Sequence, residues 1–220
     1  MAKLKKQHMT IHWKAIVQDD SSIPATEATL KEKATLVGRI GLMMLSVGTG
    51  AWRVRNSMNK VARCLGITCT ADIGLLAISY TCIEGTDTYT QSISNPTTGV
   101  NTHKLMQLEL FMKEFPDKVS TYSVKHIHEV LDEIQKIPAN YKAWNLGLAS
   151  ALACGAFTFL LGGGPVEMCC AFLGAGVGNF VRKKMLGHSI SLLANVAVSV
   201  AASCLVYVLT ILLAQSLLSV

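Results

Sequence analysis

The sequence predicts an α+β N-terminal domain in the cytoplasm, followed by an all-α membrane domain of about three transmembrane helices. The first observation is charge: the chain has 20 Lys/Arg and 14 Asp/Glu, and all but Glu167 and Arg182–Lys184 lie in residues 1–142. The second is the apolar composition of the remainder, which suits a bilayer because a charge at mid-depth costs about 2.5–3.5 kcal/mol. The third is that the first half mixes helical periodicity with short strand-like runs.

Three parts are expected: a polar N-terminal tail over 1–28, a cytoplasmic α+β domain over 29–140, and a transmembrane helical domain over 141–220. The tail opens with basic residues, but no apolar run follows them, so no secretory signal peptide is expected. The α+β domain is therefore expected to stay in the cytoplasm.

Within the α+β domain, apolar residues recur at helical spacing, then give way to Thr-, Ile- and Tyr-rich runs, and helices return after a Ser/Asn/Pro loop. The strand-like runs are short and separated by turn residues such as Gly85, which predicts a small antiparallel meander. Gly66 is expected to end the second helix in a left-handed conformation. The expected elements are helices 27–48 and 51–65, strands 67–71, 74–81 and 86–93, and helices 101–115 and 123–136.

The membrane spans are expected at about 144–161, 165–181 and 190–214. Glycines and a proline at 162–165 separate the first two, and the third stretch exceeds the ~20 residues that a bilayer needs. Lys136, Lys142 and the Arg182–Lys184 cluster would lie on one side of the membrane. Positive charge favours the cytoplasmic side, so the N-terminal domain and the 182–188 loop are placed there and the C-terminus outside.

Polar residues inside these apolar stretches are few, and hydrocarbon forces them to face protein or water. Asn195, Ser199 and Ser203 recur every four residues and would form one stripe on a helix. Asn179 lies between Gly178 and an apolar run, where small residues allow helices to approach closely. Interhelical hydrogen bonding and substrate contact both remain open for these polar groups.

The sequence contains none of the catalytic motifs sought. It has no GxSxG, HExxH or phosphate-binding glycine motif, and none of its seven cysteines forms a CxxC pair. His126 and His128 would point about 200° apart on a helix, which disfavours a shared metal ion. No catalytic residue, metal site or cofactor is expected. The net charge of +6 comes from basic residues scattered among acids, so no nucleic-acid partner is expected either.

Two strings carry a resemblance to a known family. Gly48-Thr-Gly-Ala-Trp-Arg-Val54, followed by Gly66, and Gly99-Val-Asn-Thr-His-Lys-Leu105 stand in order ahead of the apolar half. They resemble the threonine/serine exporter family, closest to the larger subunit of its split, two-polypeptide form, over about residues 36–207. The sequence departs from the family pattern at Thr49, Gly50 and Arg55, where the family places Ala and acids.

The resemblance implies a subunit of a secondary transporter in the cell (inner) membrane that exports threonine, serine or small dicarboxylates such as succinate. The family's larger subunit continues through further spans, so a second small membrane subunit, a homo-oligomer or both are the expected partners. The alternatives are a membrane-tethered hydrolase, with Cys82 or Ser79 beside His103 or His126, and a non-transporting scaffold or regulator. The candidate substrate-binding residues are Arg53, Asn101, His103, Asn179 and Asn195.

Overall fold

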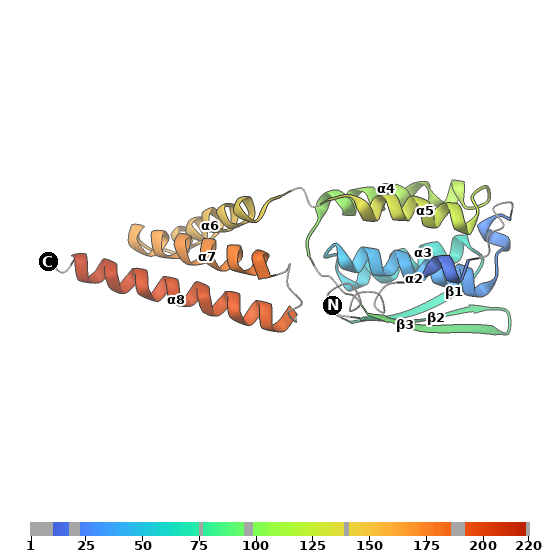
Figure 1. The fold of residues 1–220 in the computed structure, drawn as a ribbon, viewed down its shortest axis with the longest axis horizontal. Coiled ribbons are helices and arrows are strands. Elements are labelled where there is room, and N and C mark those ends of the chain that lie inside the picture. The colour runs from blue at the N-terminus through green and yellow to red at the C-terminus, as the bar shows by residue number, and fades with distance from the viewer. Residues whose placement is uncertain are drawn as a thin grey trace. The chain divides into compact units, whose positions relative to one another are not determined.

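The computed structural model describes residues 11–17, 23–74, 77–94, 99–138, 141–185 and 192–218. The chain divides into two compact units, Met1–Pro138 and Ala139–Val220. Figure 1 shows the elements of both units.

The described part of the N-terminal unit contains four α-helices, and three of them begin at a residue whose side chain caps the helix. Thr29 and Glu32 form a reciprocal capping box, and the side chains of Asn101 and Ser123 accept hydrogen bonds from the third residue beyond them. The four helices confirm the predicted ones within a few residues, although the third continues through Pro116. They are α2 (Leu30–Ser46), α3 (Ala51–Cys64), α4 (Thr102–Lys118) and α5 (Val124–Lys136), preceded by the 3₁₀ turns η1 (Trp13–Ala15) and η2 (Ala25–Glu27).

The predicted meander is confirmed as one antiparallel sheet of order β1-β2-β3. Its strands are β1 (Thr68–Ile73), β2 (Ala77–Glu84) and β3 (Asp87–Ser94). Gly85 has φ +58° in the two-residue turn between β2 and β3, a conformation that glycine adopts without strain. On β2, Ile78, Tyr80 and Cys82 are buried, whereas Ser79 and Thr81 face outward and hydrogen-bond to β3.

The unit has three layers, with α2 and α3 between the sheet and the pair α4/α5 (Figure 1). A helix covered on two sides must be buried almost all round. This explains why α2 buries Lys33 and Arg39 as well as its apolar residues. Lys33 reaches Glu84 of β2 at 2.6 Å, and Arg39 reaches α5 on the opposite side.

The described residues of the C-terminal unit form three helices, α6 (Ala143–Leu160), α7 (Pro165–Met185) and α8 (Leu192–Leu218). α7 packs against both α6 and α8. The turn after α6 contains Gly162 with φ +90°. α7 continues through Arg182–Lys184, which the sequence had suggested as part of a loop.

The predicted fold class, an α+β domain followed by about three transmembrane helices, is wrong. The described residues form seven α-helices and one small sheet, and among them only α8 is long and apolar enough to cross a membrane, over Leu193–Leu217. The uncharged part of α7, residues 168–181, extends about 21 Å, and the apolar part of α6, Trp144–Leu160, about 26 Å. Both fall short of the ~30 Å hydrocarbon core. The predicted spans 144–161 and 165–181 were already shorter than the ~20 residues that a bilayer needs, and scarcity of charge alone had supported them.

Candidate functional site

The two strings that carry the family resemblance meet at one end of the N-terminal unit. The Asn101 N–H donates to the Val47 carbonyl at 3.2 Å, so the start of α4 lies against the turn between α2 and α3. Gly48 has φ +87°, and a Cβ there would lie 3.1 Å from the Val100 side chain. We call residues 48–54 and 99–105 together the motif surface.

Arg53 lies on the exposed part of the motif surface. Its guanidinium forms an ion pair with Glu109 of α4 at 3.2 Å, and both side chains are about half exposed. Trp52, 70% exposed, lies beside it with the guanidinium carbon 6.0 Å from the ring centre. Glu109 is therefore the described ion-pair partner of Arg53, and Glu84 is the partner of Lys33.

The other two candidates of the N-terminal unit stand at the start of α4. Asn101 is the N-cap of α4, and its Oδ1 accepts a hydrogen bond from the Lys104 N–H at 3.0 Å. His103 is half-buried in the first turn. Lys104 reaches across to the Gln135 carbonyl at 2.8 Å, and burial lowers the pKa of its ammonium group. The motif surface is thus tied to the last turn of α5, just before the chain leaves this unit.

A buried polar cluster that was not predicted from the sequence lies between α2 and α5. Nη1 of Arg39 donates to the His128 carbonyl at 2.8 Å and contacts Nδ1 of the same residue at 3.1 Å. Nη2 donates to the Asp132 carboxylate and to Oε1 of Gln135 at 3.1 Å. The spacing of His128, Asp132 and Gln135 on one face of a helix was the signal that could have revealed it.

Trp13 of η1 covers this cluster. Its ring stacks on the His128 imidazole with centroids 4.8 Å apart, and its Nε1 donates to Asp132 at 3.4 Å. Burial, and then the positive charge of Arg39, lower the pKa of His128 to about 3, while Asp132 acts weakly in the opposite direction. The imidazole is therefore neutral at ordinary pH, with Nδ1 accepting from Arg39. Nε2 is buried, and no described group bonds to it.

The Arg39 cluster joins α2 to α5 and is not an open binding site. Burial lowers the pKa of Arg39, and the hydrogen bond and charge of Asp132 oppose this, so the guanidinium keeps its charge against a fixed carboxylate. Its donors already have partners on α5. A substrate carboxylate would have to displace Asp132 and Trp13 to reach it.

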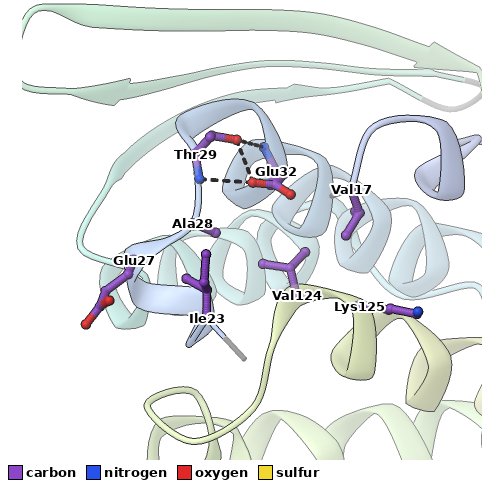
Figure 2. A pocket seen from close by; sticks show the side chains of 8 residues that line it. All are labelled: Val17, Ile23, Glu27, Ala28, Thr29, Glu32, Val124 and Lys125. Atoms are coloured by element: carbon purple, nitrogen blue, oxygen red, sulfur yellow. Dashed lines mark hydrogen bonds between the residues drawn. The ribbon is translucent and has the colours of Figure 1, made fainter. Parts of the chain in front are cut away.

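A small cavity of about 60 Å³ opens beside the N-terminus of α2 (Figure 2). The Thr29–Glu32 capping box forms one wall, with Glu32 accepting hydrogen bonds from the Thr29 hydroxyl at 2.7 Å and the Thr29 N–H at 3.1 Å. Val17, Ile23 and Val124 supply an apolar wall. Small-molecule sites usually measure about 300–1,000 Å³, so this cavity is too small for a metabolite site.

In the C-terminal unit, Asn179 and Asn195 both lie between helices. The Asn179 amide donates to the Ser150 hydroxyl of α6. Asn195, 2% exposed, donates to the Arg182 carbonyl of α7 at 3.3 Å, and its Oδ1 is buried without a described partner. Asn179 thus lies at the contact of α7 with α6, and Asn195 at the contact of α7 with α8, so the structure does not bring them into one site.

The predicted stripe on α8 faces α7. Ser203 donates to the Gly174 carbonyl at 2.8 Å, and a Cβ at Gly178 would come within 3.0 Å of the Ser199 carbonyl. Small residues therefore let α7 and α8 approach closely, and the polar stripe is largely used in that contact. Among the described side-chain atoms of this unit, Asn195 Oδ1 is the one buried polar atom without a described hydrogen-bond partner.

A larger groove of about 570 Å³ lies along α6 and α7, and its lining is apolar. Gly155 and Ala156 form part of it, with Met168 and Phe172 opposite. A polar metabolite would find no partner there. Among the described residues, no three His, Cys, Asp or Glu side chains are grouped to hold a metal ion.

The hydrolase alternative gains no support from the geometry. The Ser79 hydroxyl bonds to Ser92 at 2.9 Å on the exposed face of the sheet, and Cys82 faces the opposite, buried side. His126 is on the exposed face of α5, with its ring against Tyr122.

Residues 35–219 match a family model described as "Putative threonine/serine exporter", which covers parts of both units. No curated protein and no solved structure matches the chain.

Proposed function

Because this chain belongs to the threonine/serine exporter family, a family of membrane exporters, we propose that it is a subunit of a secondary transporter for small polar metabolites. The match over residues 35–219 carries this proposal. The substrate class is threonine and serine, or small dicarboxylates such as succinate. The N-terminal unit is in the cytoplasm of a cell (inner) membrane protein, because the basic Arg182–Lys184 cluster precedes α8 and positive charge favours the cytoplasmic side.

The transporter needs more than one polypeptide. A route for a polar solute must be lined by polar groups that are shielded from lipid. In the C-terminal unit most described side-chain hydroxyl and amide groups bond to a neighbouring helix or to their own helix, and the groove along α6 and α7 is apolar. A second small membrane subunit, further copies of this chain, or both therefore complete the route.

Asn195 is the residue of this unit best suited to contact substrate. Its Oδ1 is a buried acceptor without a described partner, and such a group costs about 1–3 kcal/mol unless something satisfies it. The ammonium group or hydroxyl of threonine or serine would satisfy it. Asn179 is a second, weaker candidate because its amide already bonds to Ser150.

The motif surface gathers substrate on the cytoplasmic side. Arg53 supplies an exposed cation for a carboxylate, and Asn101 and His103 stand at the neighbouring helix start. Lys104 of this surface donates to the Gln135 carbonyl in the last turn of α5.

Metabolite efflux tests the proposal. Cells that express this chain together with its candidate partner, preloaded with labelled threonine, serine or succinate, should lose one of these solutes faster than cells with an empty vector. Asn195→Leu should abolish the added efflux. Thr210→Val, which removes a hydroxyl bonded only within α8, should not. Unchanged efflux of all three solutes, with the protein in the membrane, would favour the scaffold alternative.

A further inference from the structure

Cys69 and Cys82 lie directly opposite each other on β1 and β2. At the end of this hairpin the Gly74 N–H donates to the Ala77 carbonyl at 2.9 Å, which makes 74 and 77 a hydrogen-bonded pair. Hydrogen-bonded and non-hydrogen-bonded pairs alternate along an antiparallel ladder. Five steps along, Cys69 and Cys82 form a non-hydrogen-bonded pair, in which the Cα atoms are about 4.5 Å apart. Disulfides occur at Cα separations of about 4.4–6.8 Å, so the backbone can accommodate a bond here.

The two thiols influence each other's ionisation. Both cysteines are free and point to the buried face, with Cys69 7% and Cys82 0% exposed. A hydrogen bond from the Cys82 thiol lowers the pKa of Cys69, and burial opposes this effect. The same hydrogen bond, followed by burial, raises the pKa of Cys82. Cys69, on the edge strand β1, is therefore the thiol that ionises first, and Cys82 supplies the second sulfur.

We propose that Cys69 and Cys82 are a dithiol modification site that hydrogen peroxide converts into a cross-strand disulfide. The Cys69 thiolate attacks one peroxide oxygen, the O–O bond breaks, and with one proton taken up the products are a sulfenic acid and water. The Cys82 sulfur then attacks the Cys69 sulfur, the S–O bond breaks, and the hydroxide leaves as water with the Cys82 proton. In total, two thiols lose two electrons and two protons, and one peroxide becomes two waters.

The arrangement distinguishes this pair from the other cysteines. Cys154, Cys169 and Cys204 are exposed, Cys64 is half-buried on α3, and Cys170 is buried on α7. None of these has a described thiol partner in strand register. Peroxide is small enough to reach Cys69 at the sheet edge, whereas a bulky oxidant would be hindered. This inference rests on the sheet geometry and is independent of the proposed transport function.

Thiol mapping on the purified full chain tests the site. The protein in detergent is treated with dilute hydrogen peroxide, its remaining thiols are alkylated after denaturation, and peptides are analysed by mass spectrometry. A peptide pair linked through Cys69 and Cys82, lighter by two hydrogens and separated by dithiothreitol, is the expected product. In Cys82→Ala, Cys69 should instead stop at sulfenic acid and react with a dimedone probe. Cys64→Ala is the matched control and should leave the linkage intact.

Two results would overturn the proposal. One is that Cys69 and Cys82 of the wild-type chain stay fully alkylatable under conditions that oxidise Cys154, Cys169 and Cys204. The other is that Cys69 is oxidised to sulfinic acid without any linked peptide. Both are read on the wild-type protein, so the test holds even if a variant fails to fold.

Discussion

At the scale of single residues, the N-terminal unit is tied together by a charged side chain in its interior. Arg39 is 4% exposed, yet its guanidinium meets the His128 carbonyl, Asp132 and Gln135 of α5. A buried ion pair is not in itself a source of stability, because desolvation offsets much of the attraction. Removing one partner is different, because it leaves a charge and several acceptors unsatisfied.

Arg39→Met should therefore lower the free energy of unfolding by about 3 kcal/mol, with some relief because Asp132 is partly exposed to water. Urea unfolding of the detergent-purified chain, followed by tryptophan fluorescence, measures this. Arg53→Met is the matched control. Its ion pair with Glu109 is half exposed, so a change within about 0.5 kcal/mol is expected. Equal losses of unfolding free energy in the two variants would contradict the interpretation that Arg39 holds α2 against α5.

His128 should make the N-terminal unit sensitive to acid. Its pKa is about 3 in the folded chain against an ordinary 6.5, and Arg39 and Asp132 are the charged groups beside it. Between these two values the unfolded chain binds a proton that the folded chain does not. The free energy of unfolding should therefore decrease as the pH is lowered from about 6.5 towards about 3, by at most about 1.4 kcal/mol per pH unit from this residue.

The comparison of wild type with His128→Gln isolates this contribution, since the other titrating groups are common to both chains. Unfolding midpoints between pH 7 and about pH 4 should fall more steeply for the wild type. Parallel slopes would show that His128 does not hold its neutral form in the fold.

At the scale of secondary-structure elements, α2 is the central helix, and its glycines set how closely the layers approach. A Cβ at Gly38 would come within 2.2 Å of the Tyr80 hydroxyl oxygen of β2. A Cβ at Gly41 would meet Met58 of α3, with the sulfur at 2.5 Å. Tyr80 is a rigid ring, 2% exposed, whereas Met58 ends in a flexible thioether.

Gly38→Ala should consequently destabilise the unit by about 1–3 kcal/mol, despite the higher helix propensity of alanine. Gly41→Ala, one turn along the same helix, should cost distinctly less because Met58 can change rotamer. Thermal unfolding of the two variants, side by side, decides between them. Greater destabilisation by Gly41→Ala than by Gly38→Ala would contradict the prediction that α2 tolerates an added methyl group less well against the sheet than against α3.

At the scale of the whole molecule, the two units differ in how much apolar side-chain surface they expose. The N-terminal unit buries its apolar residues in one core between its layers. In the C-terminal unit, α6 and α8 leave large apolar side chains exposed, among them Phe157, Phe159, Leu205 and Leu217. Exposed apolar area of this extent indicates contact with lipid or with another chain. It agrees with the exporter family to which the chain belongs.

The functional particle should therefore contain more than one membrane polypeptide. Chain purified in mild detergent and analysed by native mass spectrometry should carry further copies or a second integral membrane protein. Liposomes that contain only a monomer of this chain should not release the substrate. Efflux from such liposomes would contradict the requirement for a partner.

The sequence indicated most secondary structure because local signals fix it. Thr29, Asn101 and Ser123 stand where helix starts need a side-chain acceptor, and Gly85 stands where the hairpin turn needs a positive φ. The family strings were likewise readable from residue order. The number of membrane-spanning helices was not, because a charge-free stretch does not reveal where a helix begins and how far it extends.

By itself, then, the sequence determined the chain's local elements, its division into a charged half and an apolar half, and its family. These depend on neighbours in the chain and on composition. The extents of the helices became visible only in the structure, and among the described helices α8 alone has the length and apolarity of a span. The structure was also needed to show that Arg39 contacts α5 and that Cys69 lies opposite Cys82. It likewise showed that Asn179 lies at the contact of α7 with α6, and Asn195 at the contact of α7 with α8. Such contacts join residues far apart in the chain, and their energies depend on packing, which no local pattern encodes.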